Sequence, residues 1–135
     1  MAGVEDTELV RVFTNEVGEA FADLAFAVNQ NFEVTVEGET GSSPLAQGVQ
    51  FNTNIVVQDV TANNNIPSNP AAGFSGQIGS AAWPNANQKF VYTVNSADLA
   101  GRENHLCQVI AWLTTGLNNQ DVSFSTSPYF LIPNP

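Results

Sequence analysis

From residue 30 onward, short stretches of alternating apolar and polar residues are separated by segments rich in Gly, Pro and Asn. Phe32, Val34 and Val36, for example, alternate with polar residues, which predicts a strand with one buried and one charged face. Further strands are expected at residues 51 to 60, 74 to 83, 90 to 94, 106 to 115, 122 to 126 and 129 to 132. About six or seven short strands with turn signals between them favour an all-β sandwich or barrel over βαβ units.

The first 29 residues allow two interpretations. Apolar residues recur at helical spacing and would form one stripe of an amphipathic helix: Val10, Phe13, Val17, Phe21, Leu24 and Val28. Gly18 would destabilise that helix by about 1 kcal/mol, and residues 20 to 28 also alternate as in a strand. We therefore expect residues 1 to 29 to form a helical or extended segment that packs on the sandwich or extends from it, and residues 30 to 135 to form the sandwich domain.

The composition excludes several classes of partner. The chain has 135 residues, which fits one domain, and only 12% of them are charged. Its net charge is −10, with Arg11, Lys89 and Arg102 as the basic residues. Because three basic residues cannot neutralise a run of phosphates, we expect neither nucleic-acid binding nor attraction to an anionic membrane. The sequence also has no apolar run of about 18 residues, so membrane insertion is not expected.

The surface composition bears on localisation. Asn, Gln, Ser, Thr and Gly supply most of the polar surface, as in proteins that work outside cells. The sequence starts without the basic and apolar regions of a signal peptide, and its single cysteine, Cys107, cannot form an intrachain disulfide. We therefore expect a virion or extracellular protein that is synthesised without a recognisable signal peptide.

Catalytic and metal motifs are sparse. The one histidine, His105, lies two residues before Cys107, so a strand would place both on one face; we interpret them as a strand-start histidine beside a packed thiol. These two are too few ligands for zinc, so no enzymatic activity and no cofactor are expected. Calcium remains an alternative, because Ca²⁺ takes oxygen ligands and several carboxylates lie on one strand or at strand ends: Glu33, Glu37, Glu39, Asp59, Asp98 and Asp121.

Candidate binding residues come from aromatic and amide side chains. Trp83 precedes a proline in a turn-like segment, where an exposed indole could stack on a sugar or anchor a protein contact. The tract Asn63, Asn64 and Asn65 lies in a predicted loop, and Phe13 and Phe21 could dock the N-terminal segment on a neighbouring subunit. Trp112 lies in the most apolar predicted strand and is expected in the core.

The order of elements in the C-terminal third resembles that of immunoglobulin-like and fibronectin type III sandwiches. A strand ends in residues 98 to 101, a central strand spans residues 105 to 112, and a hairpin leads to a last strand with residues 125 to 130. The resemblance covers architecture only: the Cys-Trp-Cys framework of antibody domains is absent, and His105 stands where a tyrosine corner would have Tyr. It implies an Ig-like antiparallel β-sandwich.

Together these features predict a non-enzymatic structural module of the decoration or cement type in a virion, or a component of a surface assembly. It would bind neighbouring protein subunits, as a homo-oligomer or in a larger assembly, by burying an apolar face. The alternative is a carbohydrate-binding or adhesion module that uses Trp83 and Asn63 to Asn65, with or without Ca²⁺.

Overall fold

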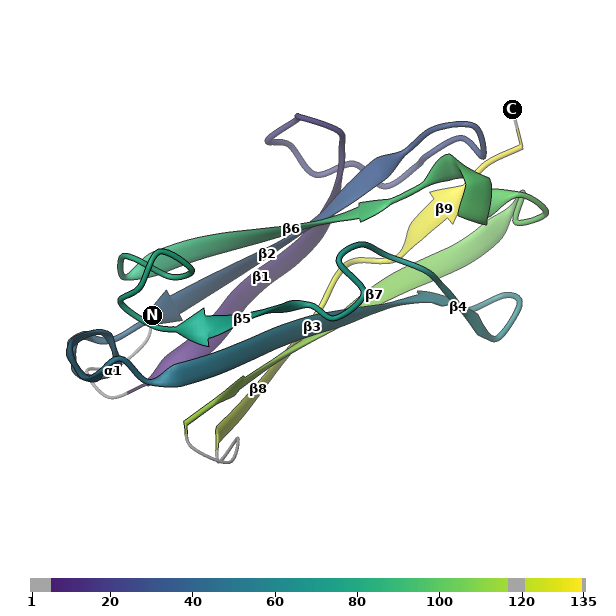
Figure 1. Cartoon of the computed structure of the whole chain (residues 1–135). Helices are drawn as coiled ribbons and strands as arrows, with labels where there is room; N and C mark the ends of the chain where they lie inside the picture. The colour runs from purple at the N-terminus through teal and green to yellow at the C-terminus, as the bar shows by residue number, and fades with distance from the viewer. Residues whose placement is uncertain (1–5, 117–120, 135) are drawn as a thin grey trace.

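The computed structural model describes residues 6 to 116 and 121 to 134, which form two stacked antiparallel sheets (Figure 1). Sheet A has the strand order β1-β2-β6, with β1 at Thr7–Glu16, β2 at Phe32–Thr40 and β6 at Asn87–Val94. Sheet B has the order β4-β3-β7-β8, with β4 at Asn64–Ile66, β3 at Gln50–Asp59, β7 at His105–Thr115 and β8 at Asp121–Thr126. Two short strands extend sheet B: β5 (Phe74–Gln77) pairs with β3, and β9 (Phe130–Ile132) pairs with β7. The predicted Ig-like antiparallel β-sandwich is confirmed.

The core lies between the sheets and follows the alternation of the sequence. On β2, Phe32, Val34 and Val36 are fully buried, as predicted. Sheet B contributes inward-facing residues of β3 and β7 to the same hydrophobic cluster, including Val57 and Val109. A buried hydrogen bond also joins the sheets, because the Tyr92 hydroxyl of β6 donates to the Thr53 carbonyl of β3 over 2.9 Å. Each large apolar side chain buried in this way contributes about 1.5–3 kcal/mol.

Residues 6 to 29 contain strand β1 and no helix, so the helical interpretation of this segment is wrong, and the strand pattern seen over residues 20 to 28 belongs to a loop. β1 is hydrogen-bonded to β2 along its length, with Val12 opposite Val36. Gly18 follows in the left-handed region at φ +79°, where it turns the chain after β1. Residues 17 to 31 have no regular structure, but Phe26 inserts into the core and stacks on Phe32 at 4.4 Å between ring centroids. The expected helical stripe is therefore not a buried face: Val10, Val17, Phe21 and Leu24 are exposed, and the segment contributes Leu9, Val12 and Phe26 to the core instead.

Two short helical turns complete the described chain: α1 at Ser42–Gln47 and the 3₁₀ turn η1 at Ser96–Leu99. Among the described residues, no helix has the length and apolar character needed to cross a membrane. Part of the loop expected between residues 114 and 121 lies outside the described residues.

Candidate protein-binding face

Strand β7 is apolar on both faces, and only one of them faces the core. Cys107 and Val109 point inward and are fully buried. Leu106, Ile110 and Trp112 lie on the opposite face and are exposed or partly exposed. Trp112, which we expected in the core, is therefore on the outer face of sheet B. The expectation was wrong because a continuous apolar strand predicts burial on both faces, whereas the chain itself covers only the inner one.

The strands on either side of β7 continue this apolar surface. Residues directly opposite each other in an antiparallel pair lie on the same face of the sheet. Phe124 of β8 is opposite Trp112, and it is 70% exposed. We call this surface the sheet B face and define it by its apolar members: Val56, Leu106, Ile110, Trp112, Val122, Phe124 and Leu131.

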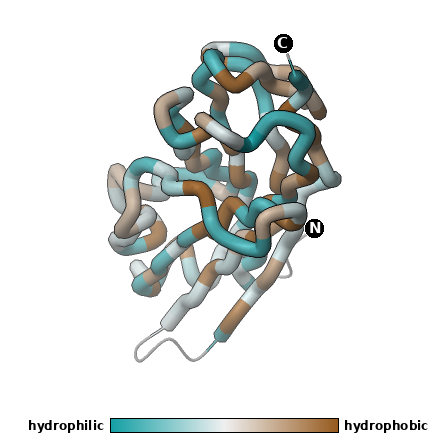
Figure 2. Tube along the Cα trace, turned by 90° about the vertical axis from the view of Figure 1, so that its right-hand side faces the viewer, coloured by the Kyte–Doolittle hydropathy of each residue, from teal (hydrophilic) through white to brown (hydrophobic). Residues whose placement is uncertain are grey.

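The sheet B face carries no charge among its described residues. The outward-facing polar residues that surround its apolar members are all uncharged: Asn52, Asn54, Gln58, Gln108, Thr114 and Thr126. Figure 2 shows hydrophobic stretches along the strands of the β7–β8 hairpin, at the lower end of the molecule. An apolar centre with few charges and a polar rim is the usual anatomy of a protein–protein interface.

The outer face of sheet A differs sharply. Its strands present cross-strand rows of charged side chains, including Arg11, Glu37 and Lys89 in one row. Along the sequence, nine of the 13 acidic residues precede residue 40: Glu5, Asp6, Glu8, Glu16, Glu19, Asp23, Glu33, Glu37 and Glu39. The strands of sheet B contain only Asp59 and Asp121, and both stand at inward-facing register positions. Most of the charged residues thus lie away from the sheet B face, but Asp6, Glu8 and Asp121 line a cleft together with Val122 at its β8 side.

The predicted contact at Trp83 is corrected by the structure. Its side chain has 0% exposure and packs edge-on against Phe51 and Phe90, with ring centroids 5.2 and 5.5 Å apart. The ring lies over Gly38 of β2, where an added Cβ would stand 2.7 Å from the indole. The segment between β5 and β6 folds this tryptophan inward as a plug at one end of the core, so it cannot stack on a sugar.

The predicted asparagine tract begins in the turn between β3 and β4 with Asn63, and Asn64 and Asn65 belong to β4. Asn63 adopts a left-handed conformation at φ +56°, and all three asparagines are exposed. Asn64 accepts a hydrogen bond from the Arg102 guanidinium at 2.6 Å. Because Trp83 is buried elsewhere, the structure does not combine the asparagines and the tryptophan into one site.

Phe13 and Phe21 have different environments. Phe13 lies on the outer side of β1 but is only 4% exposed, and the Arg11 guanidinium covers its ring at 4.2 Å from the centroid. It is therefore not available as a docking contact, because a cation–π contact already covers it. Phe21 is 78% exposed in the loop after β1 and stays a candidate contact.

A buried ionic cluster closes the end of sheet B near the asparagine tract. The Asp59 carboxylate has 0% exposure; its Oδ2 accepts a 2.7 Å hydrogen bond from Arg102 Nη1 and lies 2.7 Å from His105 Nδ1. The Ala62 N–H donates to Oδ1 over 3.0 Å. Burial alone would raise the pKa of Asp59, but the hydrogen bonds from His105, Ala62 and Arg102 outweigh burial and hold this pKa below its usual value. The cluster links β3, β7 and the turn before β7, and both oxygens of the Asp59 carboxylate have partners, so we assign it a structural role.

Cys107 and His105 share one face of β7, as predicted. Burial raises the pKa of the Cys107 thiol to about 12; the Asp59 carboxylate adds to the rise, and Arg102 opposes it. A nucleophilic cysteine needs the opposite shift, toward the thiolate. This thiol is therefore a packed core group.

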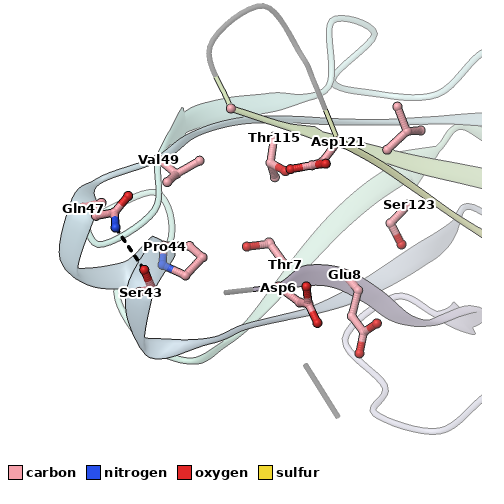
Figure 3. A pocket seen from close by; sticks show the side chains of 12 residues that line it. Asp6, Thr7, Glu8, Ser43, Pro44, Gln47, Val49, Thr115, Asp121 and Ser123 are labelled. Carbon is pink, nitrogen blue, oxygen red and sulfur yellow. Dashed lines mark hydrogen bonds between the residues drawn. The ribbon is translucent and has the colours of Figure 1, made fainter. Parts of the chain in front are cut away.

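A cleft of about 490 Å³ lies between the start of β1, helix α1 and the start of β8 (Figure 3). Its lining is largely polar and includes the carboxylates of Asp6, Glu8 and Asp121. The close-up shows these carboxylates on the β1 and β8 sides, with Ser43 hydrogen-bonded to Gln47 over 2.9 Å on the helix side. No group of three or more His, Cys, Asp or Glu side chains in the described part of the chain is arranged to hold a metal ion. The carboxylates that we considered for Ca²⁺ are therefore not brought together.

The fold and the face define an Ig-like β-sandwich with an uncharged apolar outer sheet. No family model matches the sequence, and no curated protein matches it. Among solved structures, the fold is similar to that of AggA, the major subunit of aggregative adherence fimbriae type I from Escherichia coli. The two share 8% identity with a TM-score of 0.51, over 100% of this chain and 99% of that one. At this identity the similarity establishes the fold only.

Proposed function

We propose that this chain is a non-enzymatic structural subunit that binds neighbouring protein subunits through the sheet B face. The observation that carries the proposal is the pairing of Trp112 and Phe124 on a sheet surface without described charges. A folded chain gains nothing from leaving two aromatic residues of one face in water, whereas burying them against a partner provides binding free energy.

The setting that fits best is an extracellular assembly, either a virion or a cell-surface structure. Two arguments support it: the amide-rich composition with only 12% charged residues, and the similarity of the fold to that of a fimbrial major subunit. The decoration or cement role is the finer form of the proposal, in which the sheet B face docks on a larger particle.

The same observations argue against an enzyme. The one histidine is held against the buried Asp59, and Cys107 is packed with a raised pKa. The carbohydrate-binding alternative depended on an exposed Trp83 that could stack on a sugar, and this side chain is buried. A glycan contact would have to rest on Asn63 and Asn65 alone.

The test is co-sedimentation in the native source. Tagged wild-type chain should sediment with large particles, and Phe124→Glu should leave it in the slow-sedimenting fraction. Phe21→Glu is the matched control, because that phenylalanine is 78% exposed against 70% for Phe124 but lies outside the sheet B face. A chain that never sediments with particles contradicts the proposal. Loss of sedimentation with Phe21→Glu and not with Phe124→Glu would move the contact to the N-terminal segment.

A further inference from the structure

We infer that the occupant of the sheet B face is a second copy of this chain, packed face to face about a twofold axis. This inference rests on the proposed function, since it names the partner for the same face. Three observations carry it: the charge of the face, its size and the position of its aromatic residues.

Charge is the first observation. In a twofold interface each patch meets its own copy, so a charged group near the axis meets a like charge. The described outward-facing residues of sheet B carry no charge, although the chain has a net charge of −10. A positively charged partner would bind an acidic face, and the acidic face of this chain is the outer face of sheet A.

The same packing keeps the two negative charges apart. Carboxylates such as Glu33 and Glu37 lie on the outer face of sheet A, on the far side of the sandwich from the sheet B face. Two stacked sheets are about 10 Å apart, which is already about one Debye length at physiological ionic strength. Face-to-face packing through sheet B therefore places the acidic surfaces on opposite outer sides of the dimer, where salt screens their repulsion.

Size is the second observation. β3 has 10 residues and β7 has 11, which gives the face a length of about 33 Å at about 3.3 Å per residue. Four neighbouring strand positions at about 4.8 Å give a width of about 19 Å. The resulting area is on the order of 600 Å² per copy, which reaches the lower end of the range for a specific interface, about 600–1,000 Å² per partner.

The third observation is the position of the aromatic residues. Trp112 lies on the inner strand β7, between Asn54 of β3 and Phe124 of β8, the last strand of sheet B, so an amide side chain flanks the aromatic pair on the β3 side. Buried aromatic residues near the centre of an interface supply most of its binding free energy. A twofold axis near Trp112 would bring the two aromatic pairs together and leave the amides to hydrogen-bond at the rim.

The experiment is the mass of the purified full-length chain by sedimentation equilibrium over a concentration series. Wild type should approach twice the monomer mass of 14.4 kDa. Phe124→Glu buries two carboxylates near the axis, so the dimer should dissociate at least about tenfold more readily. Val91→Glu, at a 41% exposed position on the outer face of sheet A, should behave as wild type. Val122→Glu is a second variant on the same face, 53% exposed and therefore tolerated by the fold; far-UV circular dichroism checks that each variant is folded.

The outcomes separate this inference from the proposed function. If the wild type stays monomeric at every concentration, the inference that a second copy occupies the sheet B face is wrong. It is also wrong if the wild type dimerises but Phe124→Glu and Val122→Glu leave the dimer intact. If the pure chain is monomeric yet sediments with native particles through Phe124, the proposed function stands and the partner is a different protein. If the pure chain neither dimerises nor sediments with native particles, both the inference and the proposed function are wrong.

Discussion

The removal of one carboxylate should test the cluster that closes sheet B. In Asp59→Asn, the amide cannot accept from the Ala62 N–H and also from Arg102 and His105, which approach from the other side of the carboxylate. One orientation places its NH₂ against the guanidinium, and the other leaves the Ala62 N–H without its acceptor. Removing one partner of a buried ion pair costs about 3–5 kcal/mol. Arg102 keeps its contacts to Asn64 and the Asp98 carbonyl, so we expect about 2–3 kcal/mol.

The same variant predicts a dependence on pH. The folded-state pKa of Asp59 lies below the ordinary value of 3.8. Its ionised form therefore stabilises the fold fully above the unfolded-state pKa, and this contribution is lost as the pH falls through the lower folded-state pKa. The free-energy difference between wild type and Asp59→Asn should be constant down to about pH 5 and shrink below about pH 4.

Urea denaturation at a series of pH values measures both effects. Asp121→Asn is the control, because Asp121 is exposed and its replacement should change the free energy of unfolding by less than about 0.5 kcal/mol. A difference under about 0.5 kcal/mol for Asp59→Asn at pH 7 would refute the reasoning. So would a difference that does not change in acid.

Three further outcomes follow from the core. Trp83→Ala should lose about 3–5 kcal/mol in urea denaturation because it empties a fully buried site, whereas Trp112→Ala on the outer face should lose clearly less; equal losses would contradict the two placements. Tyr92→Phe removes the hydrogen bond to the Thr53 carbonyl and should cost about 1–2 kcal/mol, so an unchanged urea midpoint would count against that bond. Cys107 should resist an uncharged thiol reagent at pH 8 until the protein is unfolded, because its pKa is about 12; rapid labelling of the folded protein would contradict its burial.

The sequence alone was sufficient where alternation marks a one-sided strand. Phe32, Val34 and Val36 face the core as expected, and so do Phe51 and Val57 of β3. The period of two decides this directly, since each second side chain points to the same sheet face.

The prediction failed at two places where the local sequence does not show which side chains become buried. The apolar residues at helical spacing over residues 10 to 28 lie on a strand and a loop, and four of the six are exposed, so their spacing does not reflect one buried face. Trp83 precedes Pro84 in a segment rich in turn residues, and only the tertiary fold shows that the ring turns inward onto Gly38. Both failures concern contacts between segments that are distant in the sequence.

The candidate face was partly visible in the sequence. Val122, Phe124 and Thr126 alternate with serines, and the structure places the serines inward and Phe124 outward. An apolar strand such as β7 does not reveal which of its faces the chain covers, so Trp112 was assigned to the core. An alternating partner strand with small polar residues on its inward side was the available signal.

The central claim is that the outer face of sheet B is buried against protein in the associated state. The most direct measurement is acrylamide quenching of tryptophan fluorescence in wild type and Trp112→Phe at high and low protein concentration, because Trp83 is shielded in either state. The account predicts that the Trp112 contribution is protected at high concentration and becomes accessible on dilution or in Phe124→Glu. If the protein associates while Trp112 stays equally accessible at every concentration, another face makes the contact and the account is contradicted.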